Sequence, residues 1–306
     1  MTEVVVGRWG STLYLPNVDF SLKEFFPYIT DEADAMGFEI PGQWYHVEKP
    51  EKHQNFIEEQ EKLASTLESL GVKVRRPNHY EGNQLDALTT CYSRDPIITI
   101  GDKMIVANLR NGSRRAEKGL YLEILLDLAK NYKGEVIMMP DNAPGDVEGN
   151  VYLEGGDVFV NGNEIYVGHT GNASNEAGIK WLQETLGDDY KVYKVDLHRD
   201  VLHLDCAMML LNDHQGIICK GDLVNQELPG KLKDYEWVEV TKEEANHMAT
   251  NGVVVNPKTA IMADKYPHII KEVEDKFGIK VIAIPFDKAN YMGGDLRCSY
   301  QPIHRK

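Results

Sequence analysis

The sequence has few cysteines, no long apolar run and a shortage of positive charge. Its four cysteines include no Cys-x-x-Cys pair, which argues against a zinc knuckle or a dithiol redox centre. Lys and Arg number 33 against 48 Asp and Glu, and the resulting net charge of -15 disfavours a protein that binds nucleic-acid phosphates. No stretch approaches the roughly 20 apolar residues of a membrane span. We therefore expect an ordinary globular protein without nucleic-acid or membrane partners.

The N-terminal segment MTEVVVGRWG places Glu3 and Arg8 beside a very short apolar run, which differs from a signal peptide. We expect a cytoplasmic protein whose cysteines are free thiols. A length of 306 residues permits one large domain or two small ones. Because one repeat pattern runs through the chain, we predict a single domain over 1–306. The sequence leaves a homo-oligomer open.

The repeat consists of an amphipathic helix, a short turn and an apolar strand. From apolar residues at helical spacing, helices are predicted at 51–70, 114–132, 175–186 and 265–277. Apolar strands follow at 71–77, 134–140, 189–197, 234–241 and 278–285. Turn residues between paired apolar runs predict β-hairpins in 95–108, 156–169, 203–221 and 251–264.

Two architectures fit such a repeat, a solenoid and a closed ring. The loops after the strands are rich in Asp, Glu, His and Gly, and they recur once per unit. This favours a closed ring of ββαβ-type units whose loops meet on one axis. The C-terminal segment 298–305 can pair with 4–9 and close the ring.

Four of these loops carry compact sets of ionisable residues, in segments 92–96, 153–157, 202–206 and 293–298. Taken singly, each residue has an ordinary explanation. Asp95 before a proline is typical of a turn, and His203 lies on an apolar strand pattern. Cys298 alone would be a packed thiol. Their placement at equivalent loops of a repeat favours a common site.

The combination resembles the amidinotransferase and arginine deiminase superfamily, whose members modify guanidino groups. The shared motifs are Arg94-Asp95-Pro96, Glu154-Gly155-Gly156-Asp157, His203-Leu204-Asp205 and a glycine-led Cys298. The resemblance covers nearly the whole chain. It implies an α/β fold of the pentein type, a five-bladed propeller of ββαβ-type repeats around a pseudo-fivefold axis. It also implies catalysis without a cofactor or a metal ion.

The resemblance also implies roles for individual residues. Cys298 matches the nucleophile, His203 the general acid and base, and Glu154 a catalytic carboxylate. Asp95 and Asp205 match carboxylates that surround the substrate. Arg110, Asn172 and Asp157 complete the predicted substrate-binding set.

The chemistry explains why these residue types occur together. A guanidinium carbon is a poor electrophile because three nitrogens donate into it, so attack requires a thiolate. Carboxylates bind the planar guanidinium with geometric specificity. A histidine, whose ordinary pKa lies near neutrality, delivers a proton to the departing amine. The amidino group then remains on sulfur until a second nucleophile removes it.

The second nucleophile distinguishes the classes of enzyme. An insertion at about 10–50 and the segment 71–77 resemble amidinotransferases, whereas Glu154 is more typical of deiminases. Deiminases carry Arg-Thr where this chain has Asn172-Ala173, so Arg110, Arg114, Arg115 or Arg297 would have to bind a substrate carboxylate. We predict an amidinotransferase with an arginine-like guanidine donor and an amine acceptor. The alternative is a guanidine hydrolase of the same superfamily, and a more distant one is a non-catalytic binding module.

Overall fold

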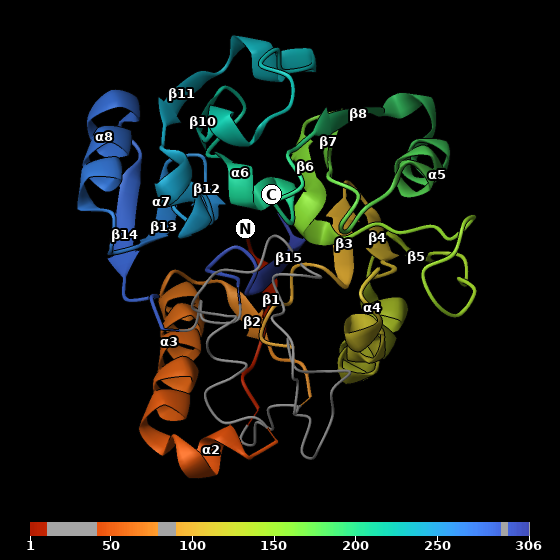
Figure 1. Cartoon of the computed structure of the whole chain (residues 1–306), viewed down its shortest axis with the longest axis horizontal. Helices are drawn as coiled ribbons and strands as arrows, with labels where there is room; N and C mark the ends of the chain where they lie inside the picture. Colours follow the sequence, from red (N-terminus) through yellow and green to blue (C-terminus); the bar gives the residue numbers. More distant parts are fainter. Residues whose placement is uncertain (11–41, 79–89, 289–292, 306) are drawn as a thin grey trace.

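The computed structural model describes residues 1–10, 42–78, 90–288 and 293–305 (Figure 1). Residues 11–41, which make up most of the predicted insertion, lie outside the described residues. Within the described part, the strands form five three-stranded sheets with one shared topology. In each sheet an antiparallel pair is extended by a third, parallel strand. None of the described helices is long and apolar enough to cross a membrane.

Figure 1 shows the five sheets arranged around the centre of the molecule, which fits a propeller-like arrangement. The first sheet contains β15 (Tyr300–His304), β1 (Glu3–Val6) and β2 (Lys73–Arg75). The second and third contain β3 (Ile97–Ile100), β4 (Lys103–Val106), β5 (Glu135–Met138), β6 (Val158–Asn161), β7 (Glu164–His169) and β8 (Lys191–Asp196). The fourth and fifth contain β9 (Met208–Leu210), β10 (Gln215–Ile218), β11 (Glu236–Glu239), β12 (Val253–Asn256), β13 (Thr259–Ala263) and β14 (Lys280–Ile284).

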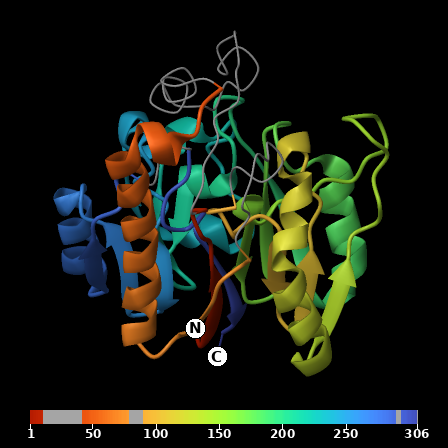
Figure 2. The ribbon, with the colours of Figure 1, turned by 90° about the horizontal axis from the view of Figure 1, so that it is seen from below.

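Helical segments connect the second and third strands of each sheet and lie on the outside (Figure 2). In chain order they are α3 (Pro50–Ser69), η3 (Gly112–Tyr121) with α4 (Leu122–Asn131), α5 (Glu176–Leu186), η7 (Gly230–Asp234) and α8 (Pro267–Phe277). Shorter helical turns are α2 (Tyr45–Glu48), η4 (Gly155–Asp157), η5 (Gly187–Asp189), α6 (Leu204–Ala207), η6 (Lys220–Asp222) and α7 (Lys242–Asn246). Apolar side chains of the helices pack on the sheets; for example, Leu63 and Leu67 of α3 belong to the cluster of Val4 and Val6.

The predicted repeat is confirmed, with two local corrections, to the helix at 114–132 and to His203; for the fourth unit the sequence predicts no helix. The helix expected at 114–132 begins as the 3₁₀ segment η3 and is α-helical only from Leu122, consistent with the low helix propensity of Gly119. The fourth unit has only the 3₁₀ turn η7, which follows Pro229. His203 does not lie on a strand; it immediately precedes the one-turn helix α6.

The predicted pairing of 298–305 with 4–9 is also confirmed. β1 pairs antiparallel with β15 and parallel with β2, so the first sheet combines both ends of the described chain. Val4, Val5 and Val6 are completely buried, which makes this closing strand part of the core.

The sheet arrangement determines where the predicted site residues lie. One polar residue or short polar loop directly precedes the first strand of each antiparallel pair: Asp95 before β3, Glu154 before β6, His203 before β9, Asn251 before β12 and Cys298 before β15. Equivalent loops of the five units therefore supply these side chains from the same end of the sheets.

Candidate active site

His203 lies among buried carboxylates. Its Nε2 is 2.9 Å from Oε2 of Glu154, and its Nδ1 is 3.9 Å from Oδ1 of Asp95. Burial by itself lowers the pKa of His203, but Asp95, Asp157 and Glu154 outweigh it and raise this pKa to about 10. His203 is therefore an imidazolium at neutral pH, and its Nε2–H donates to Glu154.

Asp95 is held by a cation and a backbone amide. Its Oδ2 accepts a hydrogen bond from Nη1 of Arg114 at 2.7 Å, and its Oδ1 accepts one from the N–H of Gly156 at 2.8 Å. Arg114 is buried and also donates two hydrogen bonds to Glu117. Burial raises the pKa of Asp95, but His203 and Arg114 outweigh this and hold that pKa below its ordinary value. Asp95 is thus an ionised carboxylate in a fixed position.

Glu154 differs from Asp95 because no arginine or lysine of the described residues forms an ion pair with it. Its Oε1 accepts a hydrogen bond from the backbone N–H of Arg110 at 2.8 Å, and its Oε2 accepts one from His203. A carboxylate oxygen has two lone pairs, so each oxygen retains one. Glu154 therefore keeps the capacity to bind the N–H groups of a guanidinium ion.

Asp157 connects three loops. Its Oδ1 accepts a hydrogen bond from the N–H of Leu204 at 3.1 Å, and its Oδ2 accepts one from the N–H of Ser174 at 3.2 Å. Burial raises the pKa of Asp157 to about 7. These contacts make Asp157 a positioning residue, and a contact with substrate stays a prediction.

Cys298 lies just before β15 and beside Asp205. Its Sγ is 3.8 Å from Oδ2 of Asp205, and its N–H donates to Oδ1 of Asn251 at 3.1 Å. Burial raises the pKa of the Cys298 thiol well above its ordinary value, and the charge of Asp205 adds to this effect. The thiol is therefore protonated in the free protein, and a cation beside it would favour the reactive thiolate.

Asp205 is paired with Arg297 across a distance of 2.7 Å between Oδ2 and Nη1. Arg297 also donates to the carbonyl oxygens of Gly156 and Val158, and its guanidinium carbon lies 3.8 Å from the centre of the Phe159 ring. The predicted contact between Asp205 and substrate stays a prediction.

Backbone contacts join the His203 group to the Cys298 group. The N–H of Arg94 donates a hydrogen bond to the carbonyl oxygen of Cys298 at 3.0 Å. Asp95 is the next residue after Arg94, so this bond brings the backbone of Asp95 close to that of Cys298. The N–H of Gly156 binds Asp95, and a Cβ at Gly156 would lie 2.6 Å from Nδ1 of His203. Only glycine permits this approach, and the loops thereby form one site.

The arginines considered for a substrate carboxylate are engaged elsewhere. Arg110 donates to Asp146 at 2.9 Å and to the carbonyl oxygen of Gly171. Arg115 donates to two backbone carbonyls and to the Tyr152 hydroxyl. Arg114 and Arg297 balance buried carboxylates, as described above, so neither is free to bind a substrate carboxylate.

Asn172 lies at the position where deiminases have arginine. Its Nδ2 donates to the carbonyl oxygens of Arg199 at 2.8 Å and Val201 at 3.2 Å. The side chain thus joins the loop before α5 to the loop that leads into α6. Its predicted role in substrate binding stays a prediction.

One potential ligand atom from each of Asp95, Glu154 and His203 lies within 4.8 Å of the others, which is a spacing that a metal ion can use. The ligand atoms are already engaged, because His203 binds Glu154 directly and Arg114 binds Asp95. A metal ion would have to displace an imidazolium and compete with a buried guanidinium. The sequence-based expectation of a metal-free site stays a prediction.

The sequence analysis missed Asn251 and Glu117. Oδ1 of Asn251 accepts hydrogen bonds from the N–H groups of Arg297 and Cys298, and its Nδ2 donates to the carbonyl oxygen of Asp205. Its position before β12, equivalent to that of Asp95 before β3, was the signal that could have found it. Glu117 carries no such signal, because its pairing with Arg114 depends on the folded 3₁₀ segment.

A family model described as N,N dimethylarginine dimethylhydrolase, eukaryotic, matches residues 32–305. The chain belongs to this family. The match, together with the structural neighbours below, places it in the pentein superfamily and confirms the resemblance seen in the motifs. The family match extends over all the strands from β2 onward and over every predicted site residue.

A curated relative, inosamine-phosphate amidinotransferase 1 of Streptomyces glaucescens, is 23% identical over 336 residues, covering 100% of this chain and 94% of the relative. The solved structure of inosamine-phosphate amidinotransferase from Streptomyces griseus has a TM-score of 0.81 at 20% identity, with 100% and 94% coverage. DDAH from Pseudomonas aeruginosa, solved with citrulline, has a TM-score of 0.69 at 18% identity, covering 98% of each chain. These structures establish a shared fold with both amidinotransferases and hydrolases.

Proposed function

We propose that this protein is an amidinotransferase that moves the amidino group of arginine, or of a similar guanidine, to an amine acceptor through a covalent intermediate on Cys298. The observation that carries the proposal is the meeting of Cys298 and Asp205 with His203, Glu154 and Asp95 at one end of the sheets. This set contains a thiol, a protonated imidazole and carboxylates, which are the groups that the reaction requires.

Substrate binding is the first step. The guanidinium ion donates to the free lone pairs of Glu154, with its carbon facing Sγ of Cys298. Burial and the Asp205 carboxylate both raise the pKa of the Cys298 thiol. The positive charge of the substrate lowers this pKa again. The thiol releases its proton to solvent as the substrate binds, because His203 already carries its own proton, and an unoccupied site keeps the unreactive thiol.

Attack forms a C–S bond and a tetrahedral adduct. The imidazolium of His203 then donates its proton to the departing nitrogen, the C–N bond breaks, and the amine product leaves an amidino group on sulfur. With arginine as donor the released amine is ornithine. Because its pKa is raised to about 10, His203 holds the required proton throughout the neutral range.

An amine acceptor completes the cycle. Its nitrogen attacks the amidino carbon, neutral His203 takes the proton, and the C–S bond breaks to release the new guanidine and the Cys298 thiolate. The thiolate regains a proton from solvent after the product leaves. If water attacks instead, the product is a ureido compound. The family description, N,N dimethylarginine dimethylhydrolase, supports this hydrolase as the second candidate.

Transfer is favoured over hydrolysis by the two inosamine-phosphate amidinotransferases, which are similar to this chain over its whole length. The segment 169–175 contains no arginine, and the four arginines considered above are engaged with other groups of the protein. A free α-carboxylate would need such a cation in either reaction, so these contacts bear on the choice of donor and not on the choice of reaction. We also propose that the five sheets are blades of one propeller domain over 1–306, and that no cofactor takes part.

The test is incubation of the protein with arginine, with and without a panel of amines, followed by quantification of ornithine and citrulline. The proposal expects ornithine and a new guanidine only when an amine is present. Citrulline formed without an amine would establish the hydrolase instead. Absence of both products, together with no adduct on Cys298, would favour a binding module. Turnover that is lost on chelation and restored by a metal ion would contradict the metal-free mechanism.

A further inference from the structure

A cavity lies among the hairpin turns and extends along the strands to Arg94, Gly155 and Arg297, the sequence neighbours of Asp95, Glu154 and Cys298. Its volume is about 580 Å³. The turns of four hairpins line it, through Gly101, Gly162, Asp213 and Pro257. The site residues precede the first strands of these same hairpins, so the hairpin turns lie at the other end of these strands. We call this space the hairpin-end cavity.

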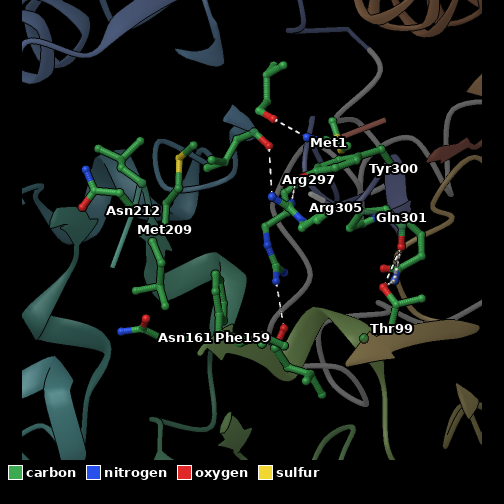
Figure 3. Close-up of a pocket in the computed structure, with 18 of the residues that line it drawn as sticks. Met1, Thr99, Phe159, Asn161, Met209, Asn212, Arg297, Tyr300, Gln301 and Arg305 are labelled. Atoms are coloured by element: carbon green, nitrogen blue, oxygen red, sulfur yellow. Dashed lines mark hydrogen bonds between the residues drawn. The ribbon is translucent and has the colours of Figure 1, made fainter. Parts of the chain in front are cut away.

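Three arginines line the hairpin-end cavity, namely Arg94, Arg297 and Arg305. Figure 3 shows one side of the cavity with Arg297, Arg305, Tyr300 and Gln301. The charge of Arg297 is balanced by Asp205. Exposed Arg305 donates to the Val254 carbonyl and to the Tyr300 hydroxyl, both at 3.4 Å, and no ion pair joins it to a carboxylate of the described residues.

Arg94 is the unusual member of this group. Its side chain is buried, with 6% of the residue exposed, and it forms no ion pair with any described carboxylate. Its Nε donates to the carbonyl oxygen of Arg297 at 3.3 Å, and its Nη1 donates to Oε1 of Gln301 at 2.9 Å. Its Nη2 is buried and has no hydrogen-bond partner among the described residues. A buried cation without an ion pair is costly unless an anion nearby compensates its charge.

The electrostatics around Tyr300 agree with an excess of positive charge. The guanidinium carbon of Arg94 lies 4.5 Å from the centre of the Tyr300 ring. Burial raises the pKa of Tyr300, but Arg94, Arg305 and Arg297 outweigh it and lower that pKa. The acidic residue on the cavity lining, Asp213, is paired with His214 at an exposed turn.

We infer that the hairpin-end cavity binds a small organic anion, a carboxylate or a phosphate, whose charge is offset by the guanidinium of Arg94. Arg305 would provide the second positive charge at the cavity lining. The volume is that of a small-molecule pocket, and the apolar walls from Phe159 and Met209 suit an organic body attached to the anionic group. This inference does not depend on the proposed function, because it concerns binding alone.

Calorimetric titration with citrate, acetate, inorganic phosphate and glycerol 3-phosphate, at constant ionic strength, tests the inference. The protein should bind at least one of these anions saturably in the millimolar range or below. A preference for citrate or for the phosphates then identifies the anionic group. Arg94→Gln should weaken binding by about tenfold or more, since an uncompensated positive charge beside the anion is lost.

Arg305→Gln should weaken binding several-fold, whereas Arg199→Gln, which removes the same charge from an exposed loop outside the cavity, should leave it unchanged. If Arg94→Gln fails to fold, Arg305→Gln decides the question, because its exposed side chain is dispensable for folding. The inference is overturned if no anion binds saturably, or if Arg305→Gln binds as tightly as the unmodified protein.

Discussion

Individual residues of the candidate active site differ in how their charges are compensated. Asp95 has a buried arginine and an imidazolium beside it, whereas Glu154 has only the imidazolium and a backbone amide. The Cys298 thiol has a carboxylate as its neighbour and no cation in hydrogen-bond contact. A guanidinium substrate therefore compensates two groups at once, the Glu154 carboxylate and the Cys298 thiolate.

Replacement of the candidate nucleophile should abolish turnover. We expect Cys298→Ser to lose essentially all activity, because a serine hydroxyl stays protonated where a bound cation would ionise a thiol. Cys219→Ser is the matched control and should retain most activity. Mass spectrometry of protein quenched during turnover should find an amidino adduct on Cys298 alone. An adduct on Cys91, Cys206 or Cys219 would contradict the assignment.

His203→Ala should slow turnover by roughly 10²–10⁴-fold, the usual loss for a general acid and base. The raised pKa also predicts a stability signature. Because the pKa rises from 6.5 to about 10 on folding, the folded protein binds more protons between these values, and the free energy of unfolding falls as pH increases through this window. The contribution is complete below pH 6.5 and lost above about 10.

Urea denaturation of the unmodified protein and of His203→Gln across this pH range measures the effect. The difference in unfolding free energy between them should shrink as the pH rises. The exposed His198→Gln serves as control and should follow the unmodified protein. Parallel curves for the unmodified protein and His203→Gln would show that the carboxylates do not hold this proton.

Glu154→Gln keeps the size of the side chain and removes its charge. We expect kcat/KM to fall by roughly 10–150-fold, the equivalent of one hydrogen bond to a charged group. Glu184→Gln, on the exposed face of α5, should leave kcat/KM unchanged. If Glu154→Gln has the same kcat/KM as the unmodified protein, Glu154 does not bind the guanidinium ion.

At the scale of elements, the sequence predicts the helices and strands better than the site. α3, α5 and α8 match their predictions within two residues at each end, because apolar periodicity and flanking Gly or Pro are local signals. Equivalent loops of the repeat led to the prediction of Asp95, Glu154, His203 and Cys298 as site residues, which stays a prediction. The pairings of Arg114 with Asp95 and of Arg297 with Asp205 were not predictable, since they join residues 19 and 92 positions apart in the sequence.

The short element η4 gives a sharp test of site geometry. In Gly156→Ala the new Cβ would lie 2.6 Å from Nδ1 of His203 and 2.9 Å from Oδ1 of Asp95, so the imidazole must move. We expect turnover to fall by about 10²-fold, the cost of misplacing a catalytic group by about 1 Å. Gly221→Ala is the control, because its Cβ would meet no atom closer than 3.8 Å. Equal activity of the two variants would mean that the position of His203 is not critical.

At the scale of the whole molecule, the ring depends on β1, which pairs with strands from both directions of the chain. Val5→Ala should lower the free energy of unfolding by about 2 kcal/mol, for two buried methyl groups and the cavity they leave. Val47→Ala, at a position 61% exposed, should change it by less than about 0.5 kcal/mol. Denaturant titration measures both. Two separate unfolding transitions would show that the sheets do not unfold as one unit.

The same closing strands have a consequence for the order in which the protein becomes active during synthesis. β1 is made before its antiparallel partner β15, the last of the described strands, and Cys298 stands directly before β15. Four sheets can assemble on the ribosome while the first remains incomplete. The proposed nucleophile therefore reaches its position beside Asp205 only after the strand that anchors it, β15, has been made, and the chemistry proposed for its thiol is withheld until then.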